Sequence, residues 1–176
     1  MIPTDAPSPP SGISRRARSL DGLLKSAKNS RERVIFAIGE SLAGKTSFLK
    51  SAVGELGFDY FPLGLQLARR LGDVPVRRRP IFVERLLADL VDFSRNIPLC
   101  LDNTELLFEP SLRCDPVRLA QNLSRTRTLI FSLNGSFQGG KFVHGHPDHP
   151  EYFTADLGSC PVVSLADGDV DFQQVP

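Results

Sequence analysis

The sequence predicts one α/β domain built in three layers, with a mostly parallel sheet between two layers of helices. Short apolar runs rich in β-branched residues alternate along the chain with stretches of helical periodicity, which is the pattern of strand–helix–strand units. The chain has 176 residues, of which 41% are hydrophobic and 23% are charged. This size and composition are typical of a single globular domain.

The first part of the chain contains two expected helices and two expected strands. Residues 1–12 are rich in proline and are predicted to form a disordered arm. Leucines at helical spacing between Arg and Lys predict an amphipathic helix over residues 13–28. Residues 34–38 form a continuous apolar run, typical of a strand buried on both faces of a parallel sheet. A helix is expected over residues 46–56, and a second strand over residues 58–63.

The alternation continues through the middle of the chain. Residues 65–71 and 80–93 are predicted to be helical, the latter with Leu, Val and Phe along one stripe. A third strand is expected over residues 97–101, a further helix over residues 115–123, and a fourth strand over residues 128–133.

The pattern weakens after Gly135. A Gly-rich loop and a His-rich segment are expected before a last strand over residues 162–165. The acidic end, residues 167–176, is expected to be a frayed tail. The predicted domain therefore spans residues 13–166.

The charges give no general argument for a polyanionic partner, because 21 basic residues stand against 20 acidic ones. No apolar run approaches the ~20 residues of a membrane-spanning helix, and the first residues lack the apolar stretch of a secretion signal. The three cysteines are an odd number at irregular spacing, which fits reduced thiols. We expect a cytoplasmic protein that does not bind membranes.

The most specific motif is GESLAGKT, residues 39–46, which matches GxxxxGK[ST] at every defined position. It lies between a predicted strand and a predicted helix, as a phosphate-binding loop (P-loop) requires. Backbone N–H groups of such a loop bind phosphate, Lys45 adds a positive charge, and Thr46 is expected to place its hydroxyl on Mg²⁺. The ligands predicted are ATP and Mg²⁺, and the predicted binding residues are Gly39, Glu40, Ser41, Leu42, Ala43, Gly44, Lys45, Thr46 and Ser47.

Asp102 ends the third predicted strand and is the expected acidic residue of a Walker B motif. At the carboxyl edge of the sheet its carboxylate can hold a Mg²⁺-bound water, and capping of a following helix is the alternative. Hydrolases of this class usually place next a Glu that deprotonates the attacking water, but Asn103 stands there. Glu105 is the remaining candidate for the base, and a solvated side chain is the equal alternative. The sequence therefore does not decide whether the protein hydrolyses ATP.

Asn134 follows the fourth predicted strand, where AAA-like ATPases place a polar sensor of the γ-phosphate. The alternative is an ordinary turn formed by Asn134 and Gly135. The sensor role requires this strand to lie between the strands that end at Gly39 and Asp102.

Arginines suggest two further roles. One cluster indicates a nucleic-acid or acidic-partner surface, although solvated helix faces are the alternative because no aromatic residues support base stacking. That cluster comprises Arg69, Arg70, Arg77, Arg78, Arg79 and Arg85. The candidates for an arginine that completes a neighbour's site are Arg113, Arg125 and Arg127.

The segment from His144 to His149 contains all three histidines and matches HxHxDH, a dinuclear metal signature. That kind of site needs further His and Asp ligands downstream, and no His follows His149. A loop near the nucleotide edge or presented to a partner is the favoured interpretation.

Taken together, the motifs resemble the small P-loop proteins called BrxF, which are components of BREX (bacteriophage exclusion) defence systems. The resemblance covers roughly residues 33–153 and depends on GESLAGKTSFL, LGLQLARRL, LDNTELLFEP, DPVRLAQNLSRTRTLI and HPDHPEYF. Such proteins look like AAA-type cores without the helical lid domain, and too few residues follow Asn134 here for that lid. The resemblance implies a role in phage resistance beside larger BREX subunits.

The leading hypothesis is a P-loop NTPase whose nucleotide state controls assembly in a defence complex, with hydrolysis that is weak or completed by a partner's arginine. Homo-oligomers fit this hypothesis too. A nucleotide- or DNA-binding adaptor without hydrolysis and a small-metabolite kinase remain alternatives. A GTPase is least favoured, because neither a DxxG nor an NKxD motif follows the expected strands.

Overall fold

The computed structural model describes residues 13–174, so the arm predicted over residues 1–12 lies outside the described residues. A six-stranded sheet forms the centre, in the order β2-β3-β4-β1-β8-β9. Its strands are β1 (Val34–Gly39), β2 (Asp59–Pro62), β3 (Leu99–Asp102), β4 (Leu129–Asn134), β8 (Val162–Ala166) and β9 (Asp169–Gln173). Neighbouring strands pair in parallel except β9, which runs antiparallel to β8.

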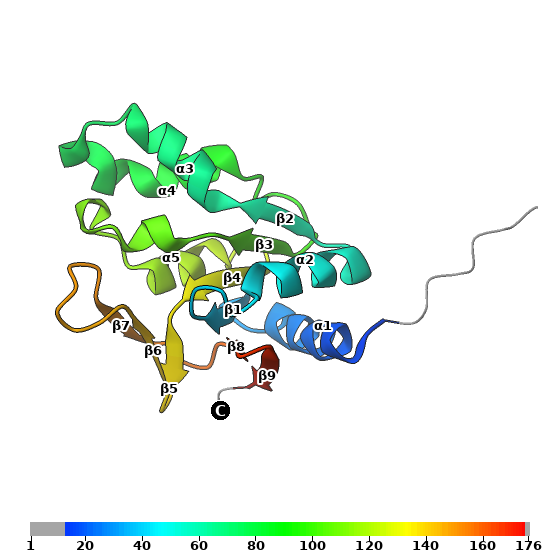
Figure 1. Ribbon diagram of the computed structural model, residues 1–176. Helices are drawn as coiled ribbons and strands as arrows, with labels where there is room; N and C mark the ends of the chain where they lie inside the picture. Colours follow the sequence, from blue (N-terminus) through cyan, green and yellow to red (C-terminus); the bar gives the residue numbers. More distant parts are fainter. Residues whose placement is uncertain (1–12, 175–176) are drawn as a thin grey trace, which may run out of the picture.

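Helices cover both faces of this sheet (Figure 1). On one face lie α1 (Arg15–Lys28) and α2 (Lys45–Leu56), and on the other lie α3 (Leu63–Gly72), α4 (Arg79–Leu90) and α5 (Pro116–Leu123). Short 3₁₀ turns η1 (Val76–Arg78), η2 (Glu105–Phe108) and η3 (Pro110–Leu112) connect elements on the second face. The predicted three-layer α/β architecture with a mostly parallel sheet is confirmed.

The burial pattern of β1 explains its central place in the sheet. All six of its residues are buried, and they alternate between the two hydrophobic clusters. Phe36 and Ile38 pack on the side of α3, α4 and α5, whereas Ile35 and Ala37 pack on the side of α1 and α2. Because both faces of the strand are covered, the sequence reads as a continuous apolar run instead of an alternating one.

The strand order agrees with the arrangement that the sensor interpretation requires. β4 lies between β1 and β3, so Asn134 ends the strand between those that end at Gly39 and Asp102. Since all three strands are parallel, their carboxyl ends meet at one edge of the sheet.

The region after Gly135 corrects one expectation. Instead of a Gly-rich loop, it forms a three-stranded antiparallel sheet of β5 (Ser136–Gln138), β6 (Lys141–His144) and β7 (Phe153–Asp156). Gly139 and Gly140 have φ of +57° and +80°, which fits a tight two-residue hairpin turn. Phe142 is fully buried and packs with the rings of Phe108 and Phe153, which ties this small sheet to η2.

The expectation of a frayed tail over residues 167–176 is wrong for residues 169–173, which form β9. Val170 and Phe172 alternate with Asp169 and Asp171, and both apolar side chains pack against the cluster beneath α1 and α2. The acidic composition concealed a half-buried edge strand, because its acids lie on the exposed face.

Among residues 13–174, no helix has the length and hydrophobicity needed to cross a membrane. All three cysteines are free, and burial raises the pKa of each thiol, to about 12 for Cys114 and about 11 for Cys160. They are therefore poor nucleophiles at neutral pH.

Candidate nucleotide-binding site

The loop between β1 and α2 depends on both glycines of the motif. A Cβ on Gly39 would lie 2.7 Å from the carbonyl oxygen of Leu165 in β8, so a larger residue would collide with backbone. Gly44 has a φ of +84° immediately before α2, a conformation that glycine adopts without strain. The loop therefore packs tightly over the end of β1 and directs the backbone into the helix.

Lys45 is folded back onto this loop. Its Nζ donates hydrogen bonds to the carbonyl oxygens of Gly39, at 2.5 Å, and Glu40, at 2.9 Å, and lies 3.4 Å from Oδ1 of Asn134. Burial lowers the pKa of the ammonium, while the carboxylates of Glu105, Asp102 and Glu40 oppose this shift. A phosphate group would be a stronger partner for this cation than the neutral carbonyls.

Thr46 and Asp102 connect α2 to the end of β3. The Thr46 hydroxyl donates to Oδ2 of Asp102 at 2.7 Å, and the Tyr60 hydroxyl donates to the same oxygen at 2.8 Å. Burial opposes ionisation of Asp102, but these hydrogen bonds outweigh it and hold the pKa of the carboxyl below its usual value. Burial, together with the bond to Asp102, raises the pKa of Tyr60. At neutral pH the site thus contains a carboxylate fixed by two hydroxyl donors.

Tyr60 was not predicted as a site residue. It belongs to β2, and only the pairing of β2 with β3 brings its hydroxyl to Asp102. No local motif marks this tyrosine, because the contact depends on which strands are neighbours.

The hydroxyl of Thr46 and the carboxylate of Asp102 are hard oxygen donors beside the loop, and they fit Mg²⁺. This ion takes one or two protein oxygens and completes its shell with phosphate and water. The fixed orientation of the Asp102 carboxylate adds to this fit, since Tyr60 holds it in place.

The chain turns sharply after Asp102. Asn103 has a φ of +55°, in the left-handed region where Asn is much more common than Glu. Thr104 is buried and donates its hydroxyl to the carbonyl of Ser132 in β4, which fixes the turn. Glu105 then begins η2, and its exposed side chain lines the same pocket as Asp102. The structure thus brings Glu105 to the site, while Asn103 occupies a backbone position unsuited to Glu.

Asn134 lies between the loop and β3. Its Nδ2 donates to the Ser41 hydroxyl at 3.3 Å, and its Oδ1 faces Lys45. Its carbonyl oxygen accepts from Nδ1 of His144 at 2.5 Å, so that ring nitrogen carries the hydrogen. His144 is buried and stacks on Phe108, with ring centroids 3.9 Å apart. The small sheet therefore supports the end of β4.

A pocket of about 390 Å³ lies where these groups meet. Its lining consists of residues 41–47 together with Asp102, Asn103 and Glu105. Seven of the nine residues that the sequence assigned to phosphate binding, residues 41–47, thus share one cavity with both candidate acids, whereas Gly39 and Glu40 do not line it.

The other histidines do not join a metal-binding cluster with His144. His146 and His149 are exposed, His146 lies 3.5 Å from Asp148, and His149 accepts a hydrogen bond from the backbone of Glu151. Within the described part of the chain, no three His, Cys, Asp or Glu side chains are grouped as metal ligands.

Arg127 is excluded as an arginine that serves a neighbouring molecule. Its side chain is 3% exposed and donates to the carbonyls of Ile97 and Asp92, both at 2.6 Å, and to the carboxylate of Asp59. These bonds join the amino ends of β2 and β3, at the edge of the sheet opposite the loop. Arg113 and Arg125 are exposed.

The arginine cluster lies on α3, η1 and α4. Five of its six members are exposed, and none forms a salt bridge with another described residue. Arg79 is half-buried and donates to the carbonyl of Val74, and the Arg78 guanidinium lies 5.3 Å from the centre of the Phe82 ring.

No protein-family model matches the chain, and a comparison with curated proteins finds no match either. The function is therefore inferred from the geometry of the site.

Proposed function

We propose that the protein is a P-loop NTPase with an AAA-like core, that the described residues form this core without a helical lid, and that it binds Mg·ATP at residues 39–47 and Asp102. The observation that supports this proposal is the meeting of four side chains at one edge of the sheet. Lys45 and Thr46 follow β1, Asp102 ends β3, and Asn134 ends the strand between them. A structural loop would have no need to bring these four groups together.

Each side chain has a defined role in this proposal. The Lys45 ammonium exchanges the Gly39 and Glu40 carbonyls for the β- and γ-phosphates, and backbone N–H groups at the start of α2 bind the phosphate chain. Thr46 would hold Mg²⁺ through its hydroxyl, and Asp102 would hold it through a Mg²⁺-bound water; the ion would neutralise charge on the phosphates. Asn134, whose Oδ1 lies 3.4 Å from Nζ of Lys45, would donate its Nδ2 to the γ-phosphate in place of the Ser41 hydroxyl.

Hydrolysis in this proposal is weak or depends on a partner. Glu105 is the base that orients and deprotonates water, since Asn103 cannot accept a proton. Glu105 is exposed where it lines the pocket, so the described residues do not sequester water on that side. A partner subunit or a second copy of the chain would close this side and supply an arginine.

The resemblance to BrxF supports a role in a BREX antiphage complex in the cytoplasm. In that role the nucleotide state controls assembly. Nucleotide binding would release Lys45 from its own loop, and Asn134 would transmit the change to the small sheet through its bond with His144.

The test is to measure binding of Mg·ATP and release of phosphate by the purified protein and by Lys45→Ala. The matched control is Lys28→Ala, which removes an exposed lysine of α1. We expect Lys45→Ala to weaken ATP binding at least about a hundredfold and Lys28→Ala to leave it unchanged. Equal ATP binding by Lys45→Ala would contradict the proposal, and phosphate transfer to a metabolite without release would favour the kinase alternative.

A second candidate function is a nucleic-acid-binding adaptor. The unpaired arginines on α3, η1 and α4 favour it, because a cluster of exposed guanidinium groups suits a phosphate backbone.

A further inference from the structure

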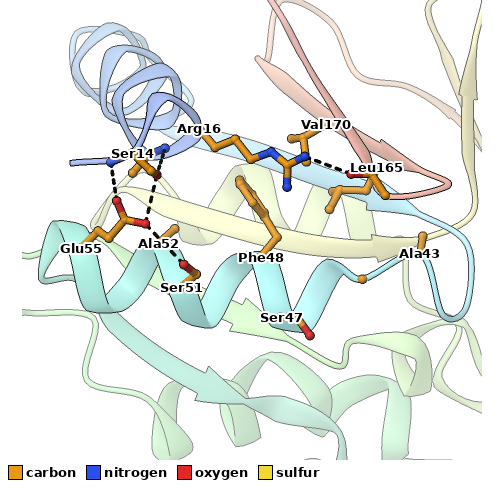
Figure 2. Close-up of a pocket in the computed structure, with 13 residues that line it drawn as sticks. Ser14, Arg16, Ala43, Ser47, Phe48, Ser51, Ala52, Glu55, Leu165 and Val170 are labelled. Carbon is orange, nitrogen blue, oxygen red and sulfur yellow. Dashed lines mark hydrogen bonds between the residues drawn. The ribbon is translucent and has the colours of Figure 1, made fainter. Parts of the chain in front are cut away.

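A second pocket adjoins the loop on the side of α1. It has a volume of about 340 Å³ and lies between the first turn of α1, the side of α2 that faces α1, and the β8–β9 hairpin (Figure 2). Ala43, Gly44 and Ser47 line both this pocket and the phosphate-loop pocket, so the two cavities adjoin each other. A ligand held by its phosphates in one can therefore extend into the other.

The order in which the phosphates of a nucleotide would lie along the loop favours this pocket as the site of the base. Lys45 reaches the β- and γ-phosphates in a P-loop, and here Lys45 lies toward Asn134. A bound nucleotide would therefore direct its γ-phosphate toward Asn134 and Asp102 and its α-phosphate along the first turn of α2. Ser47 and Phe48 are the next residues in that direction, and both line the second pocket.

A larger cavity of about 620 Å³ on the other side of the loop does not suit the base. It is lined by residues 38–43, by Gly135 and β5, and by the end of β8 with the β8–β9 turn. It thus opens beside Gly135, next to the residue that faces the γ-phosphate, and not beside Ser47.

The second pocket has the chemistry of a site for a flat aromatic ring. Phe48 extends from α2 toward Arg16, with Leu165 and Val170 opposite, as Figure 2 shows. The Phe48 ring is held edge-on by Phe172, with ring centroids 6.3 Å apart. Arg16 donates to the carbonyl of Gly168 at 3.1 Å and so links α1 to the hairpin beside the pocket. An aromatic face, apolar walls and a guanidinium are the groups on which a base stacks.

The polar end of this pocket discriminates between purines. Glu55 is the one acid among the lining residues. Its carboxylate already accepts from the N–H of Ser14 at 2.6 Å, the hydroxyl of Ser14 at 3.0 Å and the hydroxyl of Ser51 at 3.3 Å. Guanine presents two donors here, N1–H and N2–H, and three of the roughly four acceptor positions of this carboxylate are already taken.

We infer that this pocket binds the adenine base of the nucleotide, stacked on Phe48 and enclosed by α1 and the β8–β9 hairpin. The inference rests on the proposed function, because it assigns the base of the ATP whose phosphates the loop would bind. In this arrangement two segments at opposite ends of the described chain complete the site.

The chain contains no tryptophan, so one introduced tryptophan is a unique fluorescent reporter. Phe48→Trp places it in the pocket, and Phe82→Trp on α4 is the matched control on the opposite face of the sheet. We expect Mg·ATP to change the fluorescence of Phe48→Trp, while Mg·tripolyphosphate leaves it unchanged and Phe82→Trp responds to neither. A Phe48→Trp signal that ATP does not change, although ATP displaces tripolyphosphate, would overturn the inference.

Binding measurements separate this inference from the proposed function. Phe48→Leu keeps an apolar side chain but removes the π face, and we expect about tenfold weaker ATP binding with tripolyphosphate binding unchanged. GTP should bind at least about tenfold more weakly than ATP. Equal loss for ATP and tripolyphosphate, or equal affinity for GTP, would contradict the adenine assignment. If neither ATP nor tripolyphosphate binds in a Lys45-dependent manner, the proposed function itself fails.

Discussion

The Thr46 hydroxyl donates a 2.7 Å hydrogen bond to Oδ2 of Asp102, which joins the first turn of α2 to the end of β3. α2 follows β1, and β1 and β3 are not neighbours in the sheet, because β4 lies between them. The loop must therefore extend over the end of β4 for this bond to form. That crossing places Asn134 beneath the loop, within reach of both Ser41 and Lys45.

The Asp102 carboxylate should make stability depend on pH. Its pKa is lowered in the folded chain, so its contribution is fully present above the unfolded pKa of about 3.9 and is lost as the pH falls through the folded value. We expect the unfolding free energy of the wild type, relative to that of Asp102→Asn, to be lower below about pH 4 than at pH 7. Urea unfolding at pH 7 and pH 3 measures it.

The matched control for that experiment is Asp148→Asn. Asp148 is 94% exposed, in the loop between β6 and β7. The difference between the wild type and this control should be similar at both pH values. If the difference for Asp102→Asn is likewise constant with pH, Asp102 does not hold a stabilised charge.

Glu105 should affect turnover without affecting binding. It lines the pocket, and no hydrogen bond joins it to the loop among the described residues. We expect Glu105→Gln to reduce phosphate release from Mg·ATP by about a hundredfold or more, the usual effect of losing a general base. ATP affinity should change less than about twofold.

Glu84→Gln is the control, since Glu84 is exposed on α4. Undiminished phosphate release by Glu105→Gln would remove Glu105 from the mechanism. Reduced release together with an equal loss of ATP affinity would assign it to binding instead.

The fold could be predicted largely from local patterns. The buried run of residues 34–38 and the strand that ends at Asp102 are apolar on both faces, and a parallel sheet is the arrangement that accounts for such strands. The small sheet was missed because its strands are only three or four residues long. β9 was missed because its alternating Val170 and Phe172 are separated by aspartates.

The site could be predicted only where its residues belong to a sequence motif or end a strand. Lys45 and Thr46 are fixed by the loop, and Asp102 and Asn134 by the strands that they end. Tyr60 and the supporting contact of His144 depend on strand pairing and on packing between sheets. The roles of the arginines could not be predicted, because nothing in the sequence distinguishes buried Arg127 from exposed Arg125.

Arg127 should be one of the most sensitive positions for stability. Arg127→Met leaves the Ile97 and Asp92 carbonyls and the Asp59 carboxylate without this donor, so we expect a loss of roughly 3 kcal/mol in unfolding free energy. Arg125→Met, two residues away and exposed, should change stability by less than about 0.5 kcal/mol. Chemical denaturation of both variants compares them, and equal stability would show that the Arg127 contacts contribute little.

β9 should be part of the cooperative fold. Phe172→Ser removes a ring that packs against Phe48 and the α1–α2 cluster, so we expect a loss of about 1–3 kcal/mol. Asp171→Ser alters the exposed face of the same strand and should be nearly neutral. Thermal unfolding followed by circular dichroism measures both. Indistinguishable melting temperatures would mean that β9 does not contribute to the core.

The arginine cluster should bind polyanions if the adaptor function is correct. Arg77 and Arg78 are exposed on η1 and have no acidic partner among the described residues. Each phosphate contact adds about 0.9 to the slope of log affinity against log salt concentration, so replacing both arginines with Glu should weaken duplex DNA binding and reduce that slope by about two. Titration of a labelled duplex at several salt concentrations gives both quantities.

The control makes the same change of charge on another surface, Arg15→Glu with Arg31→Glu, because both arginines are exposed near the ends of α1. A general electrostatic effect would weaken DNA binding equally in both double variants. A site on η1 would show the loss only for Arg77→Glu with Arg78→Glu. The absence of salt-dependent DNA binding by the wild-type protein would reject the adaptor function outright, and the ATPase proposal would stand independently of that result because Lys45 and Asp102 lie outside the cluster.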